Sequence, residues 1–156
     1  MKQAVTLLIA AFLLFACNNE KKEDHTGHNT HEPKTQEDSL MADVMDGHDV
    51  GMAKYGKLEA MQSKVKAALD SIAKLPLKAQ QAAAPYKSML DSAASKLSYA
   101  IYSMDKWMEE FNMDSAKDNM EARIKYLADE KMKVGKIKEA ILNSLSKADS
   151  LFSPGR

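Results

Sequence analysis

Residues 37–75 read EDSLMADVMDGHDVGMAKYGKLEAMQSKVKAALDSIAKL, and the large side chains in this stretch recur at steps of three and four. That spacing places them on one face of a single long helix, as an apolar seam. The seam positions are Met41, Met45, His48, Met52, Tyr55, Leu58, Met61, Val65, Leu69, Ile72 and Leu75. Pro76 follows directly and is expected to end the helix, because proline cannot donate a backbone hydrogen bond.

Three glycines interrupt this predicted helix, at positions 47, 51 and 56. Each lowers helix propensity by roughly 1 kcal/mol relative to alanine. They indicate either a loosened helix or a place where a second helix approaches closely.

Two further segments carry similar seams. The first opens at Pro85, a favourable first-turn residue, and runs to Phe111, and the second spans residues 120–152. Residues 77–84 form a connector with room for a helical turn. Residues 112–115 supply a break, and Ser115 and Asp118 are expected to cap the last helix. The fold class predicted is all-α, an elongated antiparallel three-helix bundle of coiled-coil type over residues 37–156.

The lengths of the three segments predict a register. Counting outward from the connector places Met52 near Trp107 and His48 near Phe111, with Met120 at the same level. The two outer helices are longer than the middle one, so residues 37–47 and 142–152 are expected to overhang. Uncovered apolar seams at those ends would favour a homodimer or another envelope protein as partner.

The N-terminus carries a different signal. Leu14-Phe15-Ala16-Cys17 closes an apolar run that is shorter than the roughly 18 residues a membrane span requires. The motif resembles a bacterial lipobox, although Phe15 stands where a smaller residue is commoner. The resemblance implies that residues 1–16 are a signal peptide and that Cys17 carries acyl chains such as palmitate, which would anchor the chain in a membrane. The alternative is a core cysteine behind an uncleaved helix.

Residues 17–36 are polar and contain almost no large apolar side chain, so we expect a disordered tether between the lipid and the bundle. His25, His28 and His31 lie within it. Imidazole binds copper, zinc and nickel, and a flexible histidine tract can collect such ions weakly. The histidines could equally be incidental linker residues.

Composition excludes several classes of function. The chain has 22 basic and 22 acidic residues, so it has no net charge with which to hold nucleic acid. It lacks a glycine-rich phosphate loop, a serine nucleophile motif and a His-Glu-x-x-His helix. We therefore expect a protein that is not an enzyme.

A histidine and several methionines are the residues in this sequence best suited to form a binding site. His48 and Met52 share a helix face, as do Met104 and Met108, and the predicted register brings the two pairs together near Trp107. Imidazole and thioether groups suit Cu(I), and an indole ring can attract a cation. In ligand types this is similar to periplasmic copper proteins that bind Cu(I) beside a tryptophan. Methionines at seam positions are also common core residues, and His48 could simply hydrogen-bond Asp49 or Asp105.

The same motifs resemble a family. A His-Asp-x-x-Met-x-Lys element at residues 48–54 and a Met-x-x-Trp-Met-x-x-Phe element at 104–111 are similar to small helical lipoproteins of Bacteroidota, often labelled viral A-type inclusion proteins. Ala53 departs from the family pattern, which has proline there. The resemblance covers residues 1 to about 111 and implies a location in the bacterial envelope, on an outer membrane facing the periplasm or the cell surface. It implies no established activity.

Two functional hypotheses follow. The leading one is a non-catalytic envelope lipoprotein whose bundle is a structural or interaction module. The alternative is a lipoprotein that binds or handles Cu(I), with His48, Met52, Met104 and Met108 as ligands.

Overall fold

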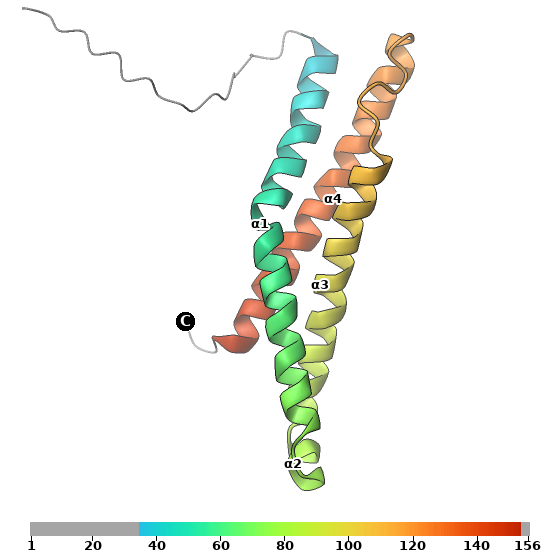
Figure 1. The fold of residues 1–156 in the computed structure, drawn as a ribbon. Coiled ribbons are helices and arrows are strands. Elements are labelled where there is room, and N and C mark those ends of the chain that lie inside the picture. Colours follow the sequence, from blue (N-terminus) through green and yellow to red (C-terminus); the bar gives the residue numbers. More distant parts are fainter. Residues whose placement is uncertain (1–34, 154–156) are drawn as a thin grey trace, which may run out of the picture. The chain divides into compact units, whose positions relative to one another are not determined.

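A computed structural model describes residues 35–153 (Figure 1). The predicted signal peptide, the lipidation site Cys17 and the tether histidines His25, His28 and His31 lie outside the described residues.

The described residues fold into a bundle of helices. Its elements are α1 (Gln36–Ala73), α2 (Leu77–Ala82), α3 (Ala84–Glu110) and α4 (Met120–Phe152). The three long helices pack along one another, and the short α2 joins α1 to α3 at the lower end (Figure 1). α3 runs antiparallel to α1 and α4. The predicted all-α antiparallel bundle is therefore confirmed, and the connector does hold a short helix.

Local sequence explains where the long helices begin. Thr35 and Asp38 form a reciprocal capping box at the start of α1, with both hydrogen bonds at 3.1 Å. Pro85 lies in the first turn of α3. The predicted cap of the last helix was wrong, because Asn119, rather than Ser115, accepts the hydrogen bond from the Ala122 amide at 3.0 Å.

The core follows the predicted seam in the second half of α1, where Leu58, Met61, Val65 and Ile72 are buried. In the first half of α1 the buried residues are Val44, Gly47 and Gly51, which lie beside the predicted positions. Fully buried side chains come from all three long helices and include Leu58, Leu90, Leu97, Leu127 and Ile141. Burying each leucine or isoleucine contributes roughly 1.5–3 kcal/mol, so these seams are the main source of stability.

Two of the three glycines mark close helix contacts. A Cβ atom on Gly47 would lie 2.8 Å from Val134 Cγ1 of α4, and one on Gly51 would collide with the Met104 methyl group of α3. A Cβ atom on Gly56 would meet no atom within 4 Å. The predicted close approach of a second helix is therefore confirmed at Gly47 and Gly51 and is wrong at Gly56.

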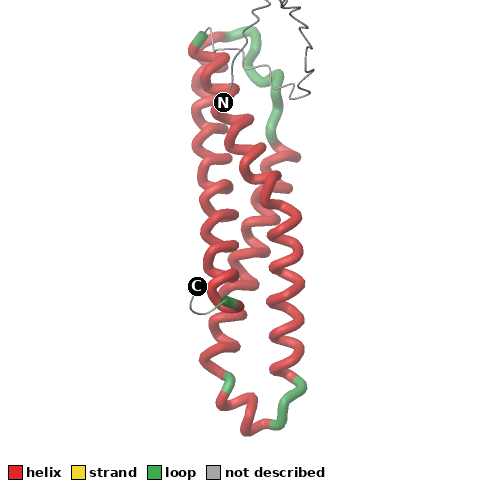
Figure 2. The backbone as a smooth tube through the Cα atoms, turned by 90° about the vertical axis from the view of Figure 1, so that its left-hand side faces the viewer, coloured by secondary structure: helices red, strands yellow, loops and turns green. Residues whose placement is uncertain are grey.

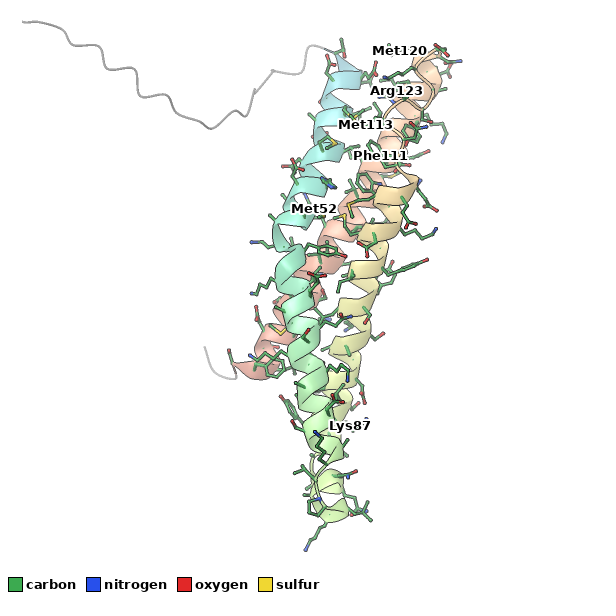
Figure 3. The ribbon with its side chains drawn as sticks, in the orientation of Figure 1. Met52, Lys87, Phe111, Met113, Met120 and Arg123 are labelled. Atoms are coloured by element: carbon green, nitrogen blue, oxygen red, sulfur yellow. The ribbon has the colours of Figure 1, made fainter. Side chains whose placement is uncertain are left out.

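The register of α4 differs from the prediction. Residues 111–119 continue in the direction of α3 beyond its end, so Met120 and Arg123 lie at the upper end of the bundle, past Phe111 (Figures 2 and 3). Arg123 there contacts Glu37, with 2.9 Å between Nε and Oε1. Met120 is thus level with the start of α1, and its predicted place beside His48 was wrong.

The predicted overhangs are consequently covered. The first turns of α4 pack against the first turns of α1, where Lys131 pairs with Asp43 at 2.6 Å and Val44 is fully buried. At the other end of α4, Leu145 and Ala148 are buried. The described part of the chain does not show the uncovered ends from which a dimer was expected, and the homodimer or envelope partner stays a prediction. None of the helices within residues 35–153 is long and apolar enough to cross a membrane.

Candidate functional site

An aromatic stack crosses the bundle where the sequence motifs meet. The rings of His48 and Trp107 lie 5.8 Å apart between centroids, Trp107 and Phe111 lie 4.8 Å apart and nearly parallel, and Phe111 and Tyr126 lie 6.2 Å apart. α1, α3 and α4 all contribute a ring. The predicted proximity of the two motifs is confirmed, but His48 contacts Trp107, one turn away from the expected Phe111.

A buried carboxylate holds the indole of Trp107. The Nε1–H group donates to Glu130 Oε2 at 2.8 Å, and the other oxygen of Glu130 accepts from Lys133 Nζ at 2.7 Å. The hydrogen bond that Lys133 donates to Glu130 raises the pKa of this lysine. Because both carboxylate oxygens have hydrogen-bond partners, the free-energy cost of burying Glu130 is compensated.

The side chains predicted to bind Cu(I) occupy different environments. Met104 is fully buried with its methyl group against Gly51, and Met52 is half-buried on the side of α1 that faces α3 (Figure 3). Met108 is 38% exposed. The structure thus brings Met104 and Trp107 against the α1 face that carries His48, while Met108 faces solvent in part.

The polar partners of His48 are also resolved. Its Nδ1 atom lies 2.9 Å from Asp49 Oδ1, as expected. Asp105, the other expected partner, instead accepts a 2.6 Å hydrogen bond from Tyr55. That hydrogen bond, with a contribution from burial, raises the pKa of Tyr55 to about 12. No cluster of three His, Cys, Asp or Glu side chains that could hold a metal ion occurs within residues 35–153.

A groove between α3 and α4 lies over Trp107. We call it the tyrosine groove; its volume is about 330 Å³, and it is lined by Tyr99, Tyr102, Ser103, Lys106, Trp107, Glu110, Lys133, Lys136 and Ile137. Tyr99 and Tyr102 are 63% and 61% exposed. Lys106 pairs with Glu110 at 2.7 Å, whereas Lys136 makes no ion pair with a carboxylate in the described part of the chain.

A second hollow lies further along the same two helices. We call it the lysine cleft; its volume is about 340 Å³, and it is lined by Ser88, Met89, Ser92, Ala93, Lys96, Lys147, Ser150 and Leu151. Both hollows combine lysines with apolar surface, so both suit ligands that carry negative charge next to an apolar group.

Sequence reasoning missed both hollows. Tyr99, Tyr102 and Lys106 recur at steps of three and four, which is a second stripe on α3 outside its apolar seam. That stripe could have been found. The opposing lysines of α4 could not, because their position depends on the register of α4.

No family model, curated protein or solved structure matches the chain. The resemblance to Bacteroidota lipoproteins therefore stays a prediction, and function must be argued from these residues.

Proposed function

We propose that this protein is a non-catalytic, lipid-anchored binding module of a bacterial envelope, and that its tyrosine groove binds an acidic helix of another envelope protein. The lipobox-like motif ending at Cys17 supports the anchor, and the absence of catalytic motifs from the sequence supports binding over catalysis.

The observation that carries the proposal is the exposure of two tyrosines over a buried tryptophan. Tyr99 and Tyr102 lie one turn apart on α3 and expose more than half of their surface, while Trp107 beside them is 5% exposed. Tyrosine and tryptophan dominate the binding energy of protein interfaces, because their rings bury a large area at a small entropic cost. The arrangement suits an interface whose centre is aromatic.

The shape of the groove favours a helix as the occupant. The groove runs between two antiparallel helices, and a further helix laid along it would complete a four-helix arrangement. Such a helix would place apolar side chains over Tyr99, Tyr102 and Ile137. Because these residues come from both walls, one apolar stripe on the partner would cover the floor of the groove.

The charges of the groove favour an acidic partner. Lys106, Lys133 and Lys136 lie along its walls, and the first two already pair with Glu110 and Glu130. Lys136 is left as the cation whose charge a partner would compensate. An Asp or Glu on the partner, placed opposite Lys136, would add affinity and fix the register of the two helices.

A charge-swap experiment tests this function. A photo-crosslinking amino acid at position 102, introduced in the native bacterium, should form an adduct with one protein, and the same amino acid at Leu77 in α2 is the control. A peptide from the crosslinked segment should bind the chain, and Lys136→Glu should weaken binding about tenfold or more. Replacing with Lys the Glu of the peptide that lies opposite position 136 should restore binding to the Lys136→Glu variant.

Three results would contradict the proposal. The first is an adduct at position 102 no stronger than that at position 77. The second is Lys136→Glu binding the peptide as well as the unaltered chain does. The third is an adduct between two copies of this chain, which would make the groove a self-association surface.

Cu(I) binding is the second candidate function. The observation that favours it is the position of His48, whose ring lies 5.8 Å from that of Trp107 on the α1 face where Gly51 contacts Met104. An imidazole, a thioether and an indole on neighbouring turns are suitable for a soft cation.

A further inference from the structure

Two lysines from different helices meet in the lysine cleft. Lys96 of α3 and Lys147 of α4 both line this cleft, one from each helix. The proximity of Lys147 lowers the pKa of Lys96. Two adjacent ammonium groups repel, so their juxtaposition opposes packing of the bundle at this point.

Nothing in the described part of the chain neutralises this pair. Neither lysine forms an ion pair with a carboxylate of residues 35–153. Asp91 and Asp149, the acids nearest to these lysines in sequence on α3 and α4, are bound elsewhere, to Lys87 at 2.8 Å and to Lys57 at 2.5 Å. The cleft is therefore a local concentration of positive charge on a chain of zero net charge.

The remaining lining residues supply hydrogen-bonding groups and an apolar wall. Ser88, Ser92 and Ser150 line the cleft with the two lysines, and Met89 and Leu151 supply apolar surface. The Ser150 hydroxyl already donates to the Lys147 carbonyl at 2.7 Å, so the hydroxyl donors offered to a ligand are those of Ser88 and Ser92. Hydroxyl and ammonium groups both donate to anionic oxygens, and the lining contains no carboxylate that would repel an anion.

We propose that the lysine cleft binds a phosphate monoester, with Lys96 and Lys147 on the phosphate group and Met89 and Leu151 against its organic part. A phosphate monoester carries close to two negative charges at neutral pH and matches two ammonium groups, whereas a carboxylate carries one. The volume of about 340 Å³ holds a phosphate and a short apolar group. This site is separate from the tyrosine groove and does not rest on the function proposed for it.

Titration of the purified full-length chain in detergent with butyl phosphate tests the site. The Cε signals of Lys96 and Lys147 in carbon NMR spectra report binding, and chloride at equal ionic strength is the reference. We expect saturable shifts with butyl phosphate, and weaker binding of inorganic phosphate, which lacks the apolar part.

Variants distinguish a specific site from general attraction. Lys96→Met and Lys147→Met should each weaken butyl phosphate binding about tenfold or more, because each removes one charge-assisted contact. Lys96→Arg should retain most of the affinity. Lys87→Met is the matched control, because Lys87 lies on the same helix and pairs with Asp91 (Figure 3). It should bind like the unaltered chain.

Two outcomes would overturn the proposal. One is a shift with butyl phosphate no larger than that with chloride, and the other is an equal loss of affinity in Lys87→Met and Lys96→Met. Circular dichroism of each variant shows whether it is folded, and the Lys96→Arg variant separates loss of charge from loss of packing.

A further comparison identifies the source of the phosphate group. Glycerol phosphate stands for a free metabolite, and a short-chain phosphatidic acid below its micellar concentration stands for a lipid headgroup. Tighter binding of the lipid supports a headgroup site, and tighter binding of glycerol phosphate supports a soluble ligand. If neither glycerol phosphate nor the phosphatidic acid binds, and butyl phosphate does not bind either, the proposed site is contradicted.

Discussion

The indole of Trp107 donates a 2.8 Å hydrogen bond to Glu130, a carboxylate that is only 5% exposed. This contact joins α3 to α4 beneath the tyrosine groove. Trp107→Phe should lower the free energy of unfolding by about 1–3 kcal/mol, because it leaves one buried carboxylate oxygen without a donor. Glu130→Gln retains an acceptor and should cost less. Urea unfolding followed by circular dichroism measures the unfolding free energy of both variants. Equal losses of stability would show that the missing hydrogen bond does not explain the destabilisation of Trp107→Phe.

Arg123 fixes the connection between α3 and α4 to the start of α1. Its side chain is 3% exposed, and it donates to Glu37 at 2.9 Å and to the Ser115 carbonyl at 2.8 Å. Arg123→Met should cost about 2–4 kcal/mol, because two partly buried acceptors lose the charged donor that a buried guanidinium supplies. Hydrogen exchange should speed up in the first turns of α1.

Lys125→Met is the control for this loss. Lys125 forms an exposed pair with Asp129 on the same helix, so its replacement should change stability by about 0.5 kcal/mol or less. If the two variants unfold at the same urea concentration, Arg123 does not stabilise the register of α4.

The glycines of α1 should respond in opposite directions to alanine. Gly56→Ala should stabilise the chain by up to about 1 kcal/mol, because the new methyl group meets no atom and helix propensity rises. Gly47→Ala should destabilise by about 1–3 kcal/mol, because its methyl group would press on Val134, whose branched side chain is stiff. Thermal unfolding of the double variant Gly47→Ala/Val134→Ala decides the cause: a loss in the double variant equal to the sum of the two single losses would exclude this contact.

Periodicity and proline positions made the helices predictable. The stretch 37–75 was expected to be one helix and is helical over Gln36–Ala73, because Pro76 stops it and the seam is unbroken. The register of α4 was not predictable in the same way. The break at residues 112–115 looks like a reversal of the chain, and only the geometry of the turns up to Asn119 carries α4 past the end of α3.

The same distinction applies to the candidate site, because some of its contacts were predictable from the sequence and others depend on the register of α4. Contact between the His48 and Trp107 motifs follows from counting along two antiparallel helices joined by a short connector. The placement of Lys96 and Lys147 in one cleft, and the hydrogen bond from Trp107 to Glu130, depend on the lateral position of α4. These two features therefore could not be predicted from the sequence.

Tyr55 makes stability depend on pH in alkaline solution. Its pKa is raised from 10.0 to about 12, first by the hydrogen bond to Asp105, so the folded state retains the phenol proton more strongly than the unfolded chain. The resulting stabilisation is complete below pH 10 and is lost as pH rises towards 12. A rise in pKa from 10.0 to about 12 corresponds to at most about 2.7 kcal/mol, which screening by solvent at this partly exposed side chain reduces. Because lysines titrate in the same range, the measurement is the difference in unfolding free energy between the unaltered chain and Tyr55→Phe. This difference should fall between pH 10 and 12, and a constant difference would contradict the assignment.

The His48 cluster gives the copper candidate a direct test. An anaerobic Cu(I) titration of the chain, in competition with a chelator of known affinity, should show one-to-one binding that is lost in His48→Ala. The same binding should persist when His25, His28 and His31 are replaced by alanine, because the Trp107 indole and the Met104 thioether lie on the bundle. Helicity should change little in His48→Ala, because the imidazole is 23% exposed and its polar contact is to the neighbouring Asp49. Binding that follows the three tether histidines, or no binding at all, would instead make Met104 a core residue and His48 a ring that packs on Trp107.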